Sequence, residues 1–126
     1  MISQPTSIEL IESVIRFIEE RAAPQLKDRD AFHARVAVNA LAAIKREIAG
    51  GQAAEDAQTE RLATLLGHDG EWAALNSELC ERIRTGAIAP TDPALLAHLK
   101  ASIVDQVRID QPQYAGLRTL AGAETP

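Results

Sequence analysis

The amino-acid sequence predicts an all-α protein, folded as a compact bundle of about five helices with the second helix central. Hydrophobic residues make up 46% of the 126 positions and aromatic residues only 3%, so alanine and leucine must supply most of the packing. Proline and glycine separate the periodic segments rather than interrupt them, which is typical of helices joined by turns. This length suits one domain. We therefore expect a single helical domain over residues 1–126, with a core from about residue 6 to residue 117 and frayed termini.

The central helix is predicted over residues 30–50. At about 100° per residue, its apolar side chains cover more than half of its circumference. They are Val36, Ala37, Ala40, Leu41, Ile44 and Ile48. A helix that is apolar nearly all round is normally surrounded by other helices. We expect Gly50 and Gly51 to end it with a left-handed cap.

Two further helices are predicted, one before and one after the central helix in the sequence. The first opens at Thr6, which forms a capping-box pattern with Glu9, and runs to about Ala22. It is amphipathic, with a wide apolar stripe. The other covers residues 53–66 and is weaker, because its first half is polar and rich in alanine. We expect this weaker helix to lie on the outside of the bundle.

The last two helices are marked by clear start and stop signals. One runs over residues 71–85 and ends at Gly86; its stripe is formed by Trp72, Leu75, Leu79 and Ile83. The other opens with a capping aspartate and a proline, Asp92 and Pro93, and runs to about residue 110. We expect its inward face to consist of Leu96, Leu99, Ile103 and Val107, and its outward face mostly of His98, Lys100, Asp105 and Arg108. A short final turn follows at Tyr114 and Leu117, and the tail from Arg118 should be frayed.

Charge and composition exclude several classes of partner. The formal net charge is −5 and no basic patch carries aromatic residues, which argues against nucleic acid and against an anionic membrane surface. No apolar run approaches the roughly 20 residues of a membrane span, and the N-terminus has no signal-peptide pattern. Cys80 is the only cysteine, so no intrachain disulfide can form. We expect a soluble cytoplasmic protein.

Polar residues on the central helix form the first candidate site. Arg35, Asn39 and Arg46 fall within one narrow sector, together with Phe32. One interpretation is structural: the sector faces solvent, or Arg35 pairs with a carboxylate on a neighbouring helix. The other is an anion-binding site, because a guanidinium group suits a carboxylate or a phosphate.

Asn76 is the second candidate, because it lies within the apolar stripe of its helix. A buried amide needs hydrogen-bond partners. Asn76 therefore either ties two helices together, through a backbone carbonyl or through Asn39, or contributes to a ligand site.

No pattern of residues indicates catalysis, a metal ion or a cofactor. His33, His68 and His98 share no helix at a spacing of three or four, and there is no Cys-x-x-Cys motif. His33 is expected to pack beside the central helix. Cys80 has no neighbouring catalytic partner in the sequence and is expected to be a small core residue. We therefore assign no catalytic or metal-binding residue and no cofactor.

Three stretches together resemble a known family. They are FHARVAVNAL at Phe32–Leu41, ALNSELCERIRTG at Ala74–Gly86 and DPALLAHLKASIVDQVRIDQPQY at Asp92–Tyr114. They resemble an uncharacterised family of short bacterial proteins, a domain of unknown function, over roughly residues 5–117. Members of that family are often encoded beside an aminoglycoside-phosphotransferase-like kinase, sometimes with acyl-CoA dehydrogenases nearby. The resemblance implies an accessory role in that pathway and brings no catalytic residue with it.

Two functional hypotheses follow. The first is a non-enzymatic accessory or protein-interaction module, acting as a homodimer or with the kinase-like partner, because the apolar stripe of the first helix is wide enough to extend into a subunit contact. The alternative is a protein that binds a small acidic or acyl/CoA-like ligand in a leucine-lined cavity, with Arg35 or Arg46 at its mouth. An enzyme is conceivable only because helical bundles can assemble sites from distant side chains.

Overall fold

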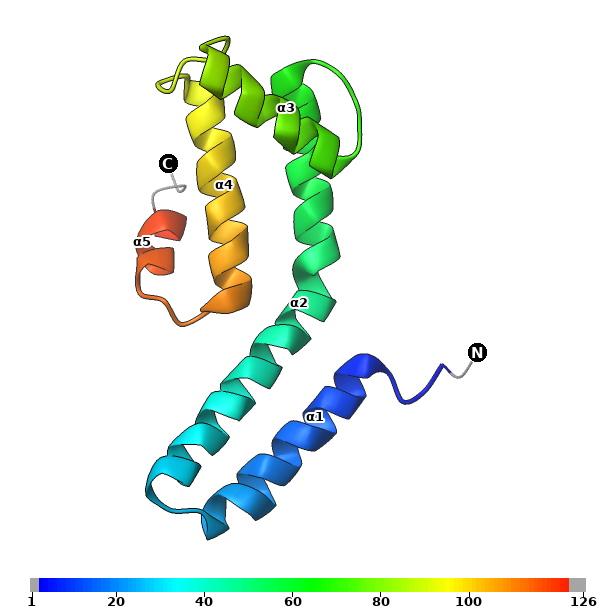
Figure 1. Cartoon of the computed structure of the whole chain (residues 1–126), viewed down its shortest axis with the longest axis vertical. Coiled ribbons are helices and arrows are strands. Elements are labelled where there is room, and N and C mark those ends of the chain that lie inside the picture. Colours follow the sequence, from blue (N-terminus) through cyan, green and yellow to red (C-terminus); the bar gives the residue numbers. More distant parts are fainter. Residues whose placement is uncertain (1–2, 123–126) are drawn as a thin grey trace. The chain divides into compact units, whose positions relative to one another are not determined.

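The computed structural model describes residues 3–122, and within this range it contains α-helices and helical turns but no β-strand (Figure 1). The five α-helices are α1 (Ser7–Phe17), α2 (Asp28–Leu66), α3 (Trp72–Thr85), α4 (Pro93–Asp110) and α5 (Gly116–Gly122). Helix α2 contacts α1, α3 and α4, which confirms both the all-α class and the central position of the second helix. The chain divides into two units, one ending at Gly50 and the other beginning at Gly51.

The N-terminal unit is a helical hairpin made of α1 and the first half of α2. The predicted capping box is present: the Glu9 amide donates to Thr6 Oγ1 over 3.2 Å, and the Thr6 amide donates to Glu9 Oε2 over 2.7 Å. After α1 the chain continues as a π-helical turn, η1 (Ile18–Ala22), and a 3₁₀ turn, η2 (Ala23–Gln25). It then reverses, so that α1 and the first half of α2 run antiparallel (Figure 1).

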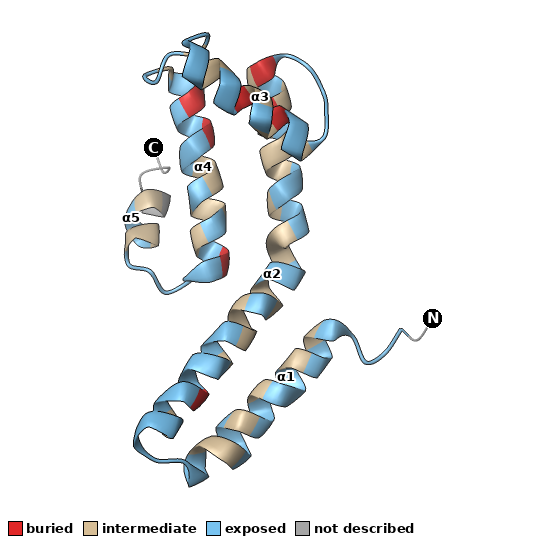
Figure 2. Cartoon of the chain, viewed as in Figure 1, coloured by how far each residue is buried: buried red, intermediate tan, exposed pale blue. Residues whose placement is uncertain are grey.

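The predicted enclosure of the central helix is wrong for residues 30–50. Val36, Ile44 and Ile48 remain 47%, 50% and 49% exposed, and among the described residues up to Gly50 only Ala34 is buried (Figure 2). The reason is geometric. A hairpin of two helices has a single seam, and the apolar circumference of the first half of α2 is much wider than the strip that α1 covers.

Helix α2 does not end at Gly50 and Gly51, so this prediction is also wrong. The helix passes through both glycines and includes the segment that was predicted as a separate third helix. Its whole length is 39 residues. Alanines flank the glycine pair, and alanine is the strongest helix former. Among the described glycines, the left-handed φ of a helix cap occurs at Gly67 and Gly86, where α2 and α3 actually end.

The C-terminal unit holds the leucine core. Its buried members are Leu62, Leu66, Leu75, Leu79 and Leu95, contributed by α2, α3 and α4. The sequence marks an apolar face in the last turns of the segment 53–66 with Leu62, Leu65 and Leu66, and this face is confirmed: Leu62 and Leu66 are buried and Leu65 packs against them. The predicted stripe of α3 is confirmed, because Trp72 and Ile83 pack against the same core.

Helix α4 is rotated relative to the expected orientation. Leu95, His98 and Ile109 are buried, whereas the predicted inward residues Leu96, Leu99 and Ile103 are 51%, 40% and 59% exposed. Leu95 joins the leucine core, and His98, Ser102 and Asp105 follow it at helical spacing on the same stripe of α4. This stripe therefore faces α2, where Arg61 lies 3.4 Å from Ser102 Oγ and 3.5 Å from Asp105 Oδ2.

The ends of α3 and α4 follow the sequence signals. Gly86 closes α3 with a φ of +81°, and Asp92 caps α4 by accepting from the amides of Ala94 and Leu95 at 2.9 and 3.0 Å. The predicted final turn is the start of α5, which extends through the segment expected to be frayed as far as Gly122. Residues 1–2 and 123–126 of the predicted frayed ends lie outside the described range.

The uninterrupted path of α2 through the glycine pair leads to a prediction about Gly50→Ala. A Cβ atom at this position would meet nothing within 4 Å. The variant should therefore gain about 0.5–1 kcal/mol in free energy of unfolding, the helical penalty of glycine relative to alanine. Urea denaturation followed by circular dichroism measures this, with Gly86→Ala as a control that should destabilise because its φ is +81°. A loss of stability in Gly50→Ala would contradict a continuous helix.

Candidate functional site

The N-terminal hairpin has one strongly apolar face. At about 100° per residue, Leu10, Val14 and Phe17 of α1 lie on the same flank of their helix. Ile44 and Ile48 of α2 lie on the flank of α2 that faces the same side of the antiparallel pair, and all five side chains are exposed. We call these five residues the apolar face. On α2, the same flank continues from Ile44 towards the N-terminus of the helix with two small apolar residues, Ala37 and Ala40.

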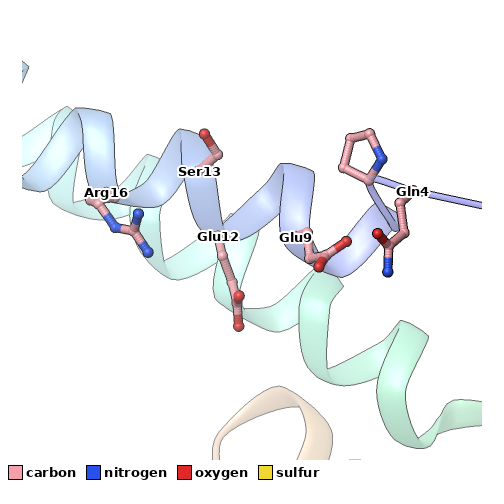
Figure 3. A pocket seen from close by; sticks show the side chains of 6 residues that line it. Gln4, Glu9, Glu12, Ser13 and Arg16 are labelled. Atoms are coloured by element: carbon pink, nitrogen blue, oxygen red, sulfur yellow. The ribbon is translucent and has the colours of Figure 1, made fainter.

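The opposite face of the hairpin is charged. It carries Glu9, Glu12 and Arg16 on α1, which line a shallow pocket of about 530 Å³ (Figure 3). The Glu12 carboxylate accepts a hydrogen bond from Lys45 Nζ over 3.0 Å, which links the two helices. The hairpin is therefore two-sided, because Glu9, Glu12 and Arg16 lie on the side of α1 away from the apolar face.

The predicted site residues of the central helix lie on the charged face. Arg35 and Asn39 are exposed, and Arg46 is half-buried. Asn76 belongs to α3 in the C-terminal unit, one helical turn after Trp72, and is half-buried. Neither of the two pockets described in this structure is lined by any of these four residues, so their role in binding stays a prediction.

Two smaller expectations are corrected by the structure. Cys80 is exposed, because it lies beside the apolar stripe of α3 rather than within it, and so it is not a core residue. His33 is also exposed and stacks edge-on against the ring of Phe32, with 5.6 Å between the ring centroids. Within residues 3–122 no group of three or more histidine, cysteine or acidic side chains is arranged to hold a metal ion.

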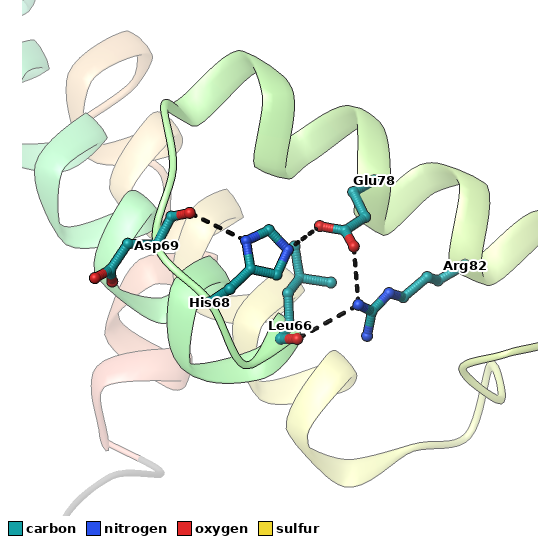
Figure 4. A network of polar contacts seen from close by, with 5 residues as sticks. All are labelled: Leu66, His68, Asp69, Glu78 and Arg82. Carbon is teal, nitrogen blue, oxygen red and sulfur yellow. Dashed lines mark hydrogen bonds and ion pairs between the residues drawn. The ribbon is translucent and has the colours of Figure 1, made fainter.

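A polar network closes the turn between α2 and α3 (Figure 4). His68 Nδ1 lies 3.0 Å from the backbone oxygen of Asp69, and His68 Nε2 lies 2.5 Å from Glu78 Oε2. Arg82 donates to Glu78 Oε1 over 2.8 Å and to the Leu66 carbonyl over 3.4 Å. The Asp69 carbonyl, followed by Glu78, raises the pKa of His68, and Arg82 together with His68 lowers the pKa of Glu78.

His98 is in the opposite situation, which the sequence did not reveal. Its side chain is only 4% exposed, and its Nδ1 atom is buried without a hydrogen-bond partner among the described residues. Burial, with a smaller effect of the Arg61 charge, lowers the pKa of His98. The imidazole is therefore neutral at pH 7. The only hint in the sequence was that His98 and Asp105 lie two turns apart on one side of α4, and Asp105 does contact Arg61, the same cation that acts on His98.

Comparison with known protein families places the chain. The model of the family described as "Domain of unknown function (DUF6285)" matches residues 24–114. The chain belongs to this family. No curated protein and no solved structure matches it. Membership agrees with the resemblance seen in the sequence at the level of an uncharacterised family, and the match covers all of α2, α3 and α4. No helix of the described range has the length and hydrophobicity needed to cross a membrane.

The two histidines in the C-terminal unit should titrate on opposite sides of their ordinary pKa of 6.5. Because the folded pKa of His68 is raised, its stabilising contribution is complete below pH 6.5 and is lost as the pH rises through the folded value. For His98 the folded pKa is lowered, so the unfolded chain takes up a proton first and stability falls as the pH drops below 6.5.

Proton NMR titration of the histidine ring signals measures this order. Glu78→Gln is the control variant, because it removes the negative charge that faces His68 and should lower the pKa of that residue while leaving His98 unchanged. A pKa for His98 above that of His68 would contradict the structure.

Proposed function

We propose that this protein is a non-enzymatic accessory module that acts by protein–protein interaction, and that its apolar face binds the same face of a second copy. The proposal rests chiefly on one observation: Leu10, Val14, Phe17, Ile44 and Ile48 are all exposed on one side of a hairpin. Contiguous exposed apolar patches on soluble proteins mark interaction sites. Single exposed apolar residues are common, but five on two adjacent helices are not explained in this way.

The stability of the hairpin supports a partner. Helix α1 has no buried residue, and Ala34 is the only one in the described part of this unit. In proteins, most helical stability comes from packing of an amphipathic face rather than from the helix itself. A second hairpin supplies the missing packing surface and completes a four-helix arrangement, in which each apolar side chain packs against others of its kind.

The size of the face suits a second copy. Two adjacent helices are about 20 Å wide, and the 16 residues from Ser7 to Ala22 span about 24 Å, which gives a face of roughly 500 Å². Two such faces together bury on the order of 1,000 Å², the lower range of specific interfaces. A two-fold contact needs a self-complementary surface, and the five side chains of the apolar face can pack against their own copies without paired charges.

The role of the charged face fits the same arrangement. Glu12, Lys45 and Arg35 stay in water when the apolar faces meet, so no ion has to be desolvated on assembly. The kinase-like partner implied by the family resemblance is the second candidate occupant of the apolar face. It would compete with self-association, so the two can be told apart by whether the isolated chain assembles.

Replacement of Ile44 by aspartate tests the proposal. We expect the wild-type protein to be a dimer at micromolar concentration, and Ile44→Asp to weaken its association at least about tenfold, because a charge would be buried in an apolar contact. Sedimentation velocity across a range of concentrations measures the equilibrium. Ile103→Asp is the matched control, since Ile103 is a similarly exposed isoleucine on α4, and it should leave association unchanged.

Two results would overturn the proposal: a wild-type chain that stays monomeric up to about 100 μM, in the concentration range of weak complexes, or equal effects of the two variants. If the chain is a monomer that forms a complex with the kinase-like protein, then that protein, and not a second copy, binds the apolar face. Circular dichroism of Ile44→Asp checks that its helices are retained, and Leu10→Lys provides an independent charge on the same face from α1.

A further inference from the structure

The C-terminal unit contains a groove between α2 and α4 that the proposed function does not use. Its volume is about 940 Å³, within the range of small-molecule sites. Its apolar lining comes from both helices and the loop before α4, through Ala57, Leu65, Ile88, Ala97 and Ala101. Arg61, Arg82 and His98 bring polar groups to the same groove, with Glu60 and Asp92 as its carboxylates.

The polar groups of the groove differ in how well they are satisfied. Asp92 accepts two amide hydrogen bonds as the cap of α4, and Arg82 is held by Glu78 and the Leu66 carbonyl. Arg61 is held weakly: its contacts to Ser102 and Asp105 are 3.4 and 3.5 Å, at the outer limit of a hydrogen bond.

Two buried polar atoms in the groove residues have no partner in the described part of the chain. One is the Nε donor of Arg61, and the other is Nδ1 of His98, whose side chain is more than nine-tenths buried. Buried polar groups in folded proteins are nearly always hydrogen-bonded, so two orphans on adjacent residues of one groove point to a missing group. The helices shield both atoms from bulk water, so the missing group must enter between the helices.

We propose that this groove binds a small aliphatic carboxylate. The carboxylate accepts from the guanidinium group of Arg61, which gives up its long contact to Asp105, and from the imidazole of His98. The alkyl chain lies along Leu65, Ile88 and the alanines of α2 and α4. A carboxylate fits better than a neutral ligand because the planar guanidinium fork is suited to two parallel hydrogen bonds. It fits better than a cation because the unpartnered Nε of Arg61 is a hydrogen-bond donor on a positively charged group.

The alanines of the groove set the size of the ligand. Ala57, Ala97 and Ala101 line a wide channel with little side-chain volume, so that a chain of several methylene groups has space beside Leu65. The ligand is therefore distinct from an inorganic anion, which would gain nothing from the apolar walls. This inference does not depend on self-association, because no residue of the apolar face lines the groove.

Calorimetric titration of the full chain with hexanoate tests the proposal, with hexanol and hexylamine as probes of equal length. We expect hexanoate to bind and the two other probes to bind at least about tenfold more weakly. Arg61→Gln should weaken hexanoate binding at least about tenfold, and Arg61→Lys should retain part of it, since lysine keeps the charge but loses the fork. Arg84→Gln is the matched control, because Arg84 is an exposed arginine that pairs with Glu81 and does not line the groove.

Each result decides the proposal. No binding of hexanoate, equal binding of hexanol or hexylamine, or equal loss of affinity in Arg61→Gln and Arg84→Gln would overturn it. If Arg61→Gln fails to fold by circular dichroism, His98→Leu takes its place with the same expected loss, because leucine is of similar size and has no hydrogen-bond donor. Ile44→Asp should bind hexanoate like the wild type, so a failure of the dimer proposal leaves this result readable.

Discussion

Two helices that pack against each other share one seam, and every apolar side chain outside that seam stays in water. This constraint governs the N-terminal hairpin. The isoleucines of α1 take up the seam with Ala34 and its neighbours on α2, and no third helix of this unit is available to cover what remains. Phe17 and Ile44 are therefore left on the surface, because the sequence contains more apolar circumference than a hairpin can bury. This exposed apolar face is the observation on which the proposed self-association rests.

The C-terminal unit shows the same physics with a different outcome. Here three helices meet, so a side chain such as Leu62 is surrounded on all sides and loses its entire exposed surface. Burying a leucine fully contributes about 1.5–3 kcal/mol. The same arrangement buries the Nε atom of Arg61 and the Nδ1 atom of His98, and neither atom has a hydrogen-bond partner among residues 3–122. The leucine core thus gives the unit its stability, while its edge supplies the groove proposed to bind a carboxylate.

Local signals made much of the fold predictable from the sequence. The capping box at Thr6, the proline after Asp92 and the glycine at Gly86 each act through neighbouring backbone atoms, and all three were predicted correctly. Gly50 was misread because a glycine pair can either end a helix or lie within one, and the surrounding alanines favour the second. The inward side of α4 was misread for another reason: the stripe of Leu96, Leu99 and Ile103 is the more apolar one, but Leu95 packs into a core whose other members come from α2 and α3, far away in the sequence.

The candidate sites were less accessible to sequence analysis than the fold. Arg35 and Asn39 were chosen because a polar residue on an apolar helix needs an explanation, and the explanation is that this side of α2 is exposed. The apolar face is formed by residues of two helices, so its continuity becomes visible only once the helices are paired. Neither orphan atom of the groove has a signature in the sequence, because being unpartnered depends on what surrounds an atom.

Hydrogen–deuterium exchange as a function of protein concentration tests the central claim, that the hairpin depends on a second copy, most directly. Amides of Ser7–Phe17 and of the facing half of α2 should become more protected as the concentration rises, because assembly stabilises only the state that binds. Amides around Leu62 and Leu79 should keep the same protection throughout, since their core is complete within one chain. Protection of the hairpin that is high and independent of concentration would contradict the account.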